Sequence, residues 1–266
     1  MSSRRTSPGL SENPDFIHGI FNYCDRWCER CGFARRCSVY SVEREAFPEQ
    51  EARDLANERF WEKLHETFEL TLELLRDVAR ERGIDLTAEV PGDHERIQEA
   101  GRDKVRENPL VKGASDYSAA ASHWLAAHED VFEEEGRKLK TEEELGIGDP
   151  QLAASAILDA VEVIRWYQNQ IMVKLMRALD GEELDVDSEI TDETEEFPKD
   201  SDGSAKVALV GIDRSIGAWG TLRNHFTSAT DSITRTLVDF DRLRSEVEAH
   251  FPDARRFVRP GFDQEV

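Results

Sequence analysis

Lysine is scarce in this chain, and long hydrophobic runs are missing from it. Only 8 of the 34 basic residues are lysines. No stretch of about 18 apolar residues is present, so we expect no membrane-spanning helix and no membrane partner. The first ten residues contain charges but no apolar run. We therefore expect no secretory signal, no oxidising compartment and a cytoplasmic protein.

Positive charge is also in short supply overall. The chain has 56 acidic residues against those 34 basic ones, which gives a formal net charge of −22. This balance disfavours nucleic acid as a partner, because attraction to phosphate needs a basic surface. Two explanations of the acidity stay open. The protein is halophilic and works in concentrated salt, where charge is screened, or it presents an acidic surface to a basic protein partner.

Several patterns typical of strands and of common enzymes are absent from the sequence. No segment alternates convincingly between apolar and polar residues, as a half-buried strand would. No glycine-rich phosphate loop, Ser-His-Asp set or Cys-His pair stands out. The sequence therefore predicts an all-α protein and leaves open whether it is an enzyme.

Apolar residues recur with a helical period of 3.6 in several long segments. The fold we predict is an antiparallel helical bundle over residues 48–250, interrupted by an acidic loop at 182–204. We expect residues 1–12 to be disordered and residues 251–266 to form an extended tail docked on the bundle. The helices that the pattern predicts cover residues 48–82, 109–135, 150–180, 205–223 and 228–250.

All four cysteines of the chain lie within one short segment. Asn13 and Pro14 form a helix-start signal. Phe16, Ile20, Cys24, Cys28 and Cys31 then follow at steps of four, four, four and three. This spacing predicts a cysteine-bearing helix with Cys24, Cys28 and Cys31 on one face, and a loop that brings back Cys37. Residues 13–47 would thus form a cysteine-cluster helix and loop packed on one end of the bundle.

Four clustered cysteines in a protein of this kind point to a metal. On an intact helix Cys24 and Cys31 would lie about 10 Å apart along the axis. A tetrahedral zinc ion needs its sulfurs roughly 3.8 Å from one another, so the larger four-iron four-sulfur cluster fits this spacing better. We therefore expect Cys24, Cys28, Cys31 and Cys37 to bind an iron–sulfur cluster used in electron transfer or redox sensing. The alternative is structural zinc on a helical scaffold or protein-interaction module.

A second group of polar residues falls on the two later helices. Glu162, Lys174, Arg177 and Asp213 could line a polar pocket, with the two cations holding an anion and a carboxylate acting as acid or base. The competing interpretation is a set of buried ion pairs that fix the register of the helices.

Four short motifs resemble those of a group of uncharacterised bacterial proteins. This resemblance extends along the whole chain and implies that the cysteine segment and the later helices form one unit. It supplies no catalytic residues. The motifs are Y-C-D-R-W-C-E-R-C at 23–31, G-S-A-K-V-A-L at 203–209, D-R-S-I at 213–216 and R-P-G-F-D at 259–263.

Overall fold

The computed structural model describes residues 13–46, 58–86, 92–188 and 199–263. Within these ranges every regular element is a helix, which confirms the all-α prediction. The chain divides into two compact units. The first comprises Met1–Asn22 and Arg26–Gln98 together with Val266, and the second comprises Tyr23–Asp25 and Glu99–Glu265. The predicted disorder of residues 1–12 falls outside the described residues.

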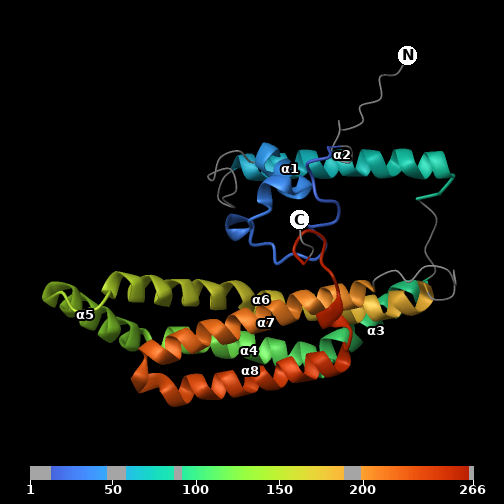
Figure 1. Cartoon of the computed structure of the whole chain (residues 1–266). Helices are drawn as coiled ribbons and strands as arrows, with labels where there is room; N and C mark the ends of the chain where they lie inside the picture. Colours follow the sequence, from blue (N-terminus) through green and yellow to red (C-terminus); the bar gives the residue numbers. More distant parts are fainter. Residues whose placement is uncertain (1–12, 47–57, 87–91, 189–198, 264–266) are drawn as a thin grey trace. The chain divides into compact units, whose positions relative to one another are not determined.

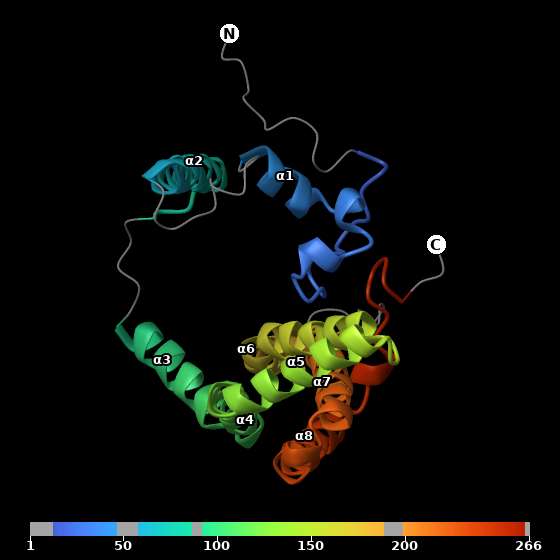
Figure 2. The ribbon, with the colours of Figure 1, turned by 90° about the vertical axis from the view of Figure 1, so that its left-hand side faces the viewer.

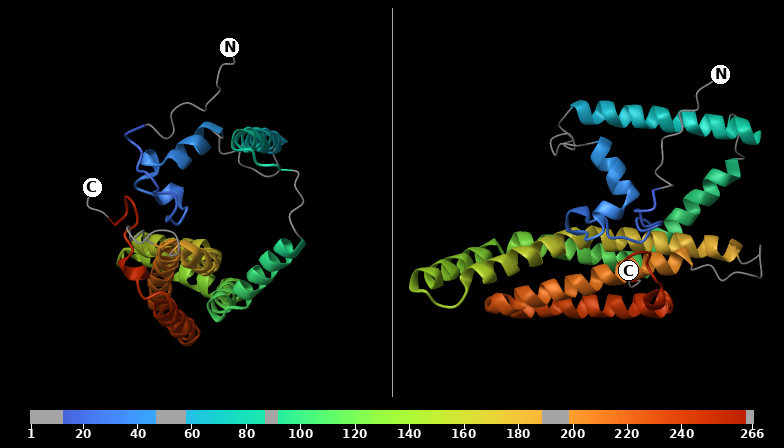
Figure 3. Two further views of the ribbon diagram at one scale, coloured as in Figure 1. Left: turned by 90° about the vertical axis from the view of Figure 1, so that its right-hand side faces the viewer. Right: turned by 45° about the horizontal axis from the view of Figure 1, so that its top comes forward.

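The second unit is built on four long helices, α4 (Pro109–Ala127), α6 (Pro150–Ser188), α7 (Asp200–His225) and α8 (Thr230–His250). Helix α6 packs along α7, α4 contacts both α6 and α8, and α7 contacts α8. The colours in Figure 1 show that α4 and α7 run in the opposite direction to α6 and α8. Figure 2 looks along these helices, and Figure 3 shows from two further sides that α6 lies beside α7.

Apolar side chains from all four helices fill the core of this bundle. The predicted stripes are buried because they meet side by side, which removes their apolar surface from water. Helix α5 (Glu129–Leu145) follows α4 after a break at His128, whose backbone leaves the helical region at φ −115° and ψ 32°. The buried core residues include Ala121, Trp124, Ile164, Ile171, Leu175, Ile212, Trp219, Ile233 and Phe240.

The predicted acidic loop at 182–204 is wrong over most of its described part. Helix α6 continues to Ser188, and α7 already begins at Asp200. Gly181, which directly follows the predicted end of this helix at residue 180, lies inside α6. A Cβ atom there would come within 3.2 Å of the backbone nitrogen of Ser201, so this glycine permits close packing of α7 instead of stopping α6.

The tail after α8 contacts the second unit, and a 3-10 helix (η5, Ala254–Arg256) interrupts the extended course that we expected. Phe251, Ala254 and Phe257 are buried. Arg255 holds the tail to α7, because its guanidinium pairs with Asp213. The described part of the tail therefore belongs to the second unit, while residues 264–266 lie outside the described residues.

In the first unit, the predicted cysteine helix is wrong. From Asn13 to Trp27 the chain makes turns and bends without an α-helix, and the first α-helix among the described residues is α1 (Ser38–Ala46). Gly19 and Arg26 have positive φ angles of 74° and 57°, which a right-handed helix does not allow. The Asn-Pro start signal makes only one turn, in which the Asn13 side chain accepts a hydrogen bond from the amide of Asp15 at 3.0 Å.

Two further helices belong neither to the four-helix core of the second unit nor to the cysteine segment. Helix α2 (Glu58–Arg82) belongs to the first unit. Helix α3 (Gly92–Glu107) contains the point in the sequence where the first unit ends and the second continues.

Candidate functional site

Three residues of the cysteine segment, Tyr23, Cys24 and Asp25, belong to the second unit although the residues on both sides of them belong to the first. We call Tyr23–Asp25 the anchor. The anchor has no regular secondary structure. Its contacts with α6 and α7 therefore determine its position.

Asp25 is held through its carboxylate and through its backbone carbonyl. The hydroxyl of Tyr167 and a guanidinium nitrogen of Arg214 both donate to carboxylate oxygen Oδ2, the latter at 2.7 Å. The carbonyl oxygen accepts from the indole Nε1 of Trp166 at 3.0 Å and from the side-chain amide of Gln170. Three donors therefore come from one face of α6, at positions 166, 167 and 170, and the fourth comes from α7.

Tyr167 is the buried centre of this arrangement, with a relative exposure of 1%. Burial raises the pKa of its phenol, and the acceptor Asp25 raises it further, while the positive charge of Arg214 acts in the opposite direction. The phenol therefore stays protonated in the neutral pH range and remains a hydrogen-bond donor. Its ring also lies against Gly211, where a Cβ atom would come within 2.9 Å of ring atom Cδ1.

Tyr23 fixes the other end of the anchor. Its hydroxyl donates to Asp200 at 2.9 Å, and the same carboxylate pairs with Arg177 at 2.8 Å. The ring packs edge-on against Phe257, with centroids 4.6 Å apart. A Cβ atom at Gly203 would lie 2.3 Å from a carbon of the Tyr23 ring, so only glycine leaves room for the ring at this position.

Cys24 therefore lies between two anchored neighbours. It is a half-buried thiol. The arrangement around it supplies hydrogen bonds and an ion pair to its neighbours, which limits how far the sulfur can move. Among these contacts we find no acid–base pair suited to catalysis, so what the anchor can do chemically is to position a thiol.

The other three cysteines lie in the first unit, on a series of tight turns. The amide of Cys31 donates to the carbonyl of Cys28 at 3.2 Å, across the 3-10 helix η1 (Cys28–Arg30). The amide of Ala34 donates to the carbonyl of Cys31 at 3.3 Å. The amide of Cys37 donates to the carbonyl of Ala34 at 3.2 Å, across the 3-10 helix η2 (Ala34–Arg36). Cys28, Cys31 and Cys37 thus stand at the ends of successive short turns instead of on one helix face.

This part of the first unit is further stabilised by two contacts. The amide of Ile17 donates to the carbonyl of Arg36 at 2.9 Å, which joins the start of the segment to η2. The guanidinium of Arg30 lies 4.2 Å from the ring centroid of Trp27, a cation–π contact. All three cysteines here are half-buried. Over the described ranges of the chain, no three His, Cys, Asp or Glu side chains form a preformed metal-binding group.

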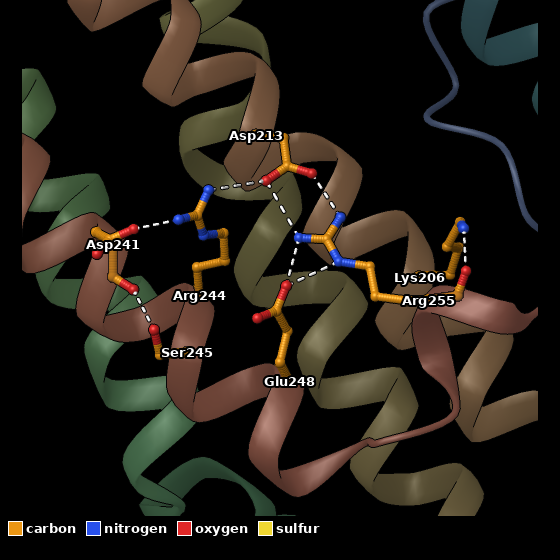
Figure 4. A network of polar contacts seen from close by, with 7 residues as sticks. All are labelled: Lys206, Asp213, Asp241, Arg244, Ser245, Glu248 and Arg255. Atoms are coloured by element: carbon orange, nitrogen blue, oxygen red, sulfur yellow. Dashed lines mark hydrogen bonds and ion pairs between the residues drawn. The ribbon is translucent and has the colours of Figure 1, made fainter.

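The structure gives the four residues of the predicted polar pocket different surroundings. Glu162 is exposed, whereas Lys174 is buried. Arg177 pairs with Asp200, next to the anchor. Asp213 lies in a separate network, shown in Figure 4.

That network ties α7 to α8 and to the tail. The carboxylate of Asp213 pairs with Arg255 at 2.5 Å and with Arg244 at 3.7 Å. Glu248 pairs with the same Arg255 at 2.6 Å, and Lys206 donates to the backbone carbonyl of Arg255 at 2.6 Å. Attraction to the two carboxylates raises the pKa of Arg255. Asp213 and Arg177 thus make ion pairs, as in the competing interpretation, but the paired side chains are 36–43% exposed instead of buried.

Two hollows on the second unit lie elsewhere. One, of about 340 Å³, is lined by residues of α4 and α8 such as Tyr117 and Phe240. The other, of about 750 Å³, is lined by residues of α4, α5 and α6 such as Phe132 and Leu158. None of the four predicted pocket residues lines either hollow.

Sequence reasoning missed Asp25, Tyr167 and Arg214 as parts of one site. The four short motifs contain Asp25 and Arg214, so they offered a signal for these two residues, whereas Tyr167 lies in none of them. Asp25 belongs to the first motif and binds Arg214 of the D-R-S-I motif, while Tyr23 packs on Gly203 of the G-S-A-K motif. Residues that belong to short motifs far apart in the sequence therefore meet at the anchor.

Comparisons with known proteins add no family assignment. No protein-family model, curated protein or solved structure matches this chain. Within the part of the chain that the structure describes, no helix has the length and apolar character needed to span a bilayer.

Proposed function

We propose that this protein binds a metal centre through the thiolates of Cys24, Cys28, Cys31 and Cys37, and that this centre is an iron–sulfur cluster used in electron transfer or redox sensing. An all-thiolate set of four ligands suits such a cluster. All four cysteines are only half-buried, and a centre near the protein surface can exchange electrons with a partner. No histidine or carboxylate is needed to complete the ligand set.

The observation that carries this proposal is the series of turns from Cys28 to Cys37. Each turn is closed by a backbone hydrogen bond of 3.2 to 3.3 Å, so the chain between these thiols is short and constrained. Since a complete ligand set rarely exists before the metal arrives, we expect the thiolates to close around the metal as it binds. Part of the binding free energy is then spent on ordering this segment.

Structural zinc is the second candidate, and the same turns favour it. The helix that would have held Cys24 and Cys31 too far apart for zinc is not formed. A C-x2-C pair across one tight turn is the usual spacing of paired ligands in structural zinc sites, and the C-x3-C pair that precedes it falls within the same range. In this case the metal would stabilise the fold and carry no electrons.

The anchor supports a fixed position for one ligand in either case. Cys24 has Tyr23 on one side and Asp25 on the other, and both are bonded to α6 and α7. Such a ligand loses less conformational freedom on metal binding than one in an unrestrained loop. We therefore assign Tyr167 and Arg214 the role of positioning residues for Cys24.

The test is metal analysis of protein purified without air, together with a visible absorption spectrum. An iron–sulfur protein would be brown, with about four iron and four sulfide per chain if the cluster is a four-iron cube. A zinc protein would be colourless with one zinc per chain, and chelation would unfold the segment. Replacing Cys31 by Ser should lower metal content in either case, whereas Ser38→Ala, next to Cys37 but without a thiol, should not.

A further inference from the structure

Helix α2 carries a row of large apolar side chains that the folded chain leaves in contact with water. Phe68, Leu72, Leu75 and Val78 are 60, 50, 55 and 42% exposed. Their spacing of four, three and three residues places them on one face of α2, a single straight helix of 25 residues (Figure 1). A contiguous apolar stripe of this kind on a polar helix marks an interaction surface.

Charged residues are distributed unevenly along one edge of this stripe. At 100° per residue, Glu58, Glu62, Glu66, Glu69 and Glu73 project from the same edge. The edge is thus acidic over the first four turns of α2.

The same edge becomes basic near the end of the helix, where Arg76 and Arg80 continue the row. Arg80 also pairs with Asp77 at 2.8 Å, but both side chains are more than half exposed, so this pair is weak and Arg80 can turn to another carboxylate.

This distribution selects an occupant for the stripe. When two identical helices pair antiparallel through one apolar face, the same edge of each helix meets the same edge of the other. The glutamates at the start of one α2 would then lie beside Arg76 and Arg80 of the second copy, and by symmetry each contact would occur twice. A parallel pair would bring opposite edges together, so these charges would not meet.

We propose that α2 mediates self-association of this protein as an antiparallel pair of α2 helices from two copies of the chain. Phe68 and Leu72, near the middle of the helix, lie at the centre of the paired stripe. Glu58 and Glu62, at the start of the glutamate row, and the arginines at positions 76 and 80 set the antiparallel direction. The row of glutamates also disfavours an anionic membrane surface as the occupant.

Sedimentation of the full chain over a range of concentrations tests the association, with reductant present so that disulfides cannot link two copies. We expect a monomer–dimer equilibrium for the unaltered protein. Replacing Leu72 and Leu75 together by Glu should raise the dissociation constant at least about a hundredfold, since each buried leucine contributes roughly tenfold or more. A monomer at every concentration, or equal association of this variant, would overturn the proposal. Circular dichroism of the variant checks that the helices are retained.

Charge reversals test the direction of pairing. Glu58→Lys with Glu62→Lys should weaken the dimer, and adding Arg76→Glu with Arg80→Glu should restore it. The matched control for the change in net charge is Glu134→Lys with Glu144→Lys, two exposed positions on α5, which should leave the dimer intact or strengthen it slightly.

Failure of the second pair of reversals to restore association would overturn the antiparallel arrangement. So would an equal loss of association in the α5 control, because the effect would then follow net charge instead of the edge of α2.

Discussion

Replacing Asp25 by Ala should destabilise the second unit, because Asp25 is one of the two residues through which α6 and α7 hold the anchor. The Tyr167 hydroxyl would lose its charged acceptor, and Arg214 would lose its ion pair. The bonds that Trp166 and Gln170 make to the backbone carbonyl do not need the side chain and should persist.

The size of the effect follows from the burial of each contact. A hydrogen bond from a buried phenol to a carboxylate is worth about 1.5–3 kcal/mol. The Arg214 side chain is 54% exposed, so its pair with Asp25 adds only about 0–1 kcal/mol. We therefore expect Asp25→Ala to lower the free energy of unfolding by roughly 1.5–4 kcal/mol. Asp25→Asn should lower it by about 1 kcal/mol, because the amide oxygen can still accept from Tyr167.

Denaturant unfolding followed by circular dichroism measures this difference, on metal-loaded and on chelated protein. The matched control is Asp239→Ala on α8. The Asp239 carboxylate pairs with Arg242 at 3.6 Å, and the two side chains are 75% and 67% exposed. This control should stay within about 0.5 kcal/mol of the unaltered protein. If Asp25→Ala were as mild as the control, the contacts of Asp25 would not hold the anchor.

Three further perturbations test other parts of the structure. Gly203→Ala should destabilise the second unit by about 1–3 kcal/mol, because the added Cβ atom would meet the Tyr23 ring. Gly217→Ala, where no atom lies within 4 Å of the added Cβ, should stabilise the unit by up to about 1 kcal/mol. Equal effects of the two variants in denaturant unfolding would contradict the packing of Tyr23 on Gly203. Burial raises the pKa of Tyr117 to about 12, so the stability it contributes is complete below its unfolded pKa of about 10 and is lost as the pH rises towards 12. Between about pH 10 and 12, the free energy of unfolding of Tyr117→Phe should fall less steeply than that of the unaltered protein, by up to about 1.4 kcal/mol per pH unit, which corresponds to one proton. An unchanged slope would exclude the Tyr117 phenol as the source of the pH dependence. If the charge of −22 is an adaptation to salt, the free energy of unfolding should rise between about 0.1 M and 1 M KCl, and full stability at low salt would count against it.

The helical bundle could be predicted because its elements are long and strongly periodic. The stripe on α6 that includes Ile164, Ile171 and Leu175 is buried as expected, since such a helix must cover its apolar face. The two predicted boundaries of the acidic loop were wrong for local reasons. Gly181 allows α7 to approach α6 closely, and glutamate-rich sequence continues a helix as readily as it forms a loop.

The cysteine segment could not be predicted because its conformation depends on distant residues. The four-residue spacing of Cys24 and Cys28 fits a helix face, but Asp25 between them is bonded to residues more than 140 positions later. Contacts of this kind override local periodicity. Arg26 has a positive φ angle, which glycine or asparagine at this position would have signalled in the sequence. An arginine gives no such signal.

Metal content of protein purified without air tests the central claim most directly. We predict one metal centre per chain, with bound iron and sulfide and a brown colour for the cluster, or a single zinc ion for the structural alternative. In both cases Cys24→Ser should reduce the metal content. Protein that contains neither iron nor zinc, and that takes up neither when the thiols are reduced, would contradict a metal-binding role for these four cysteines.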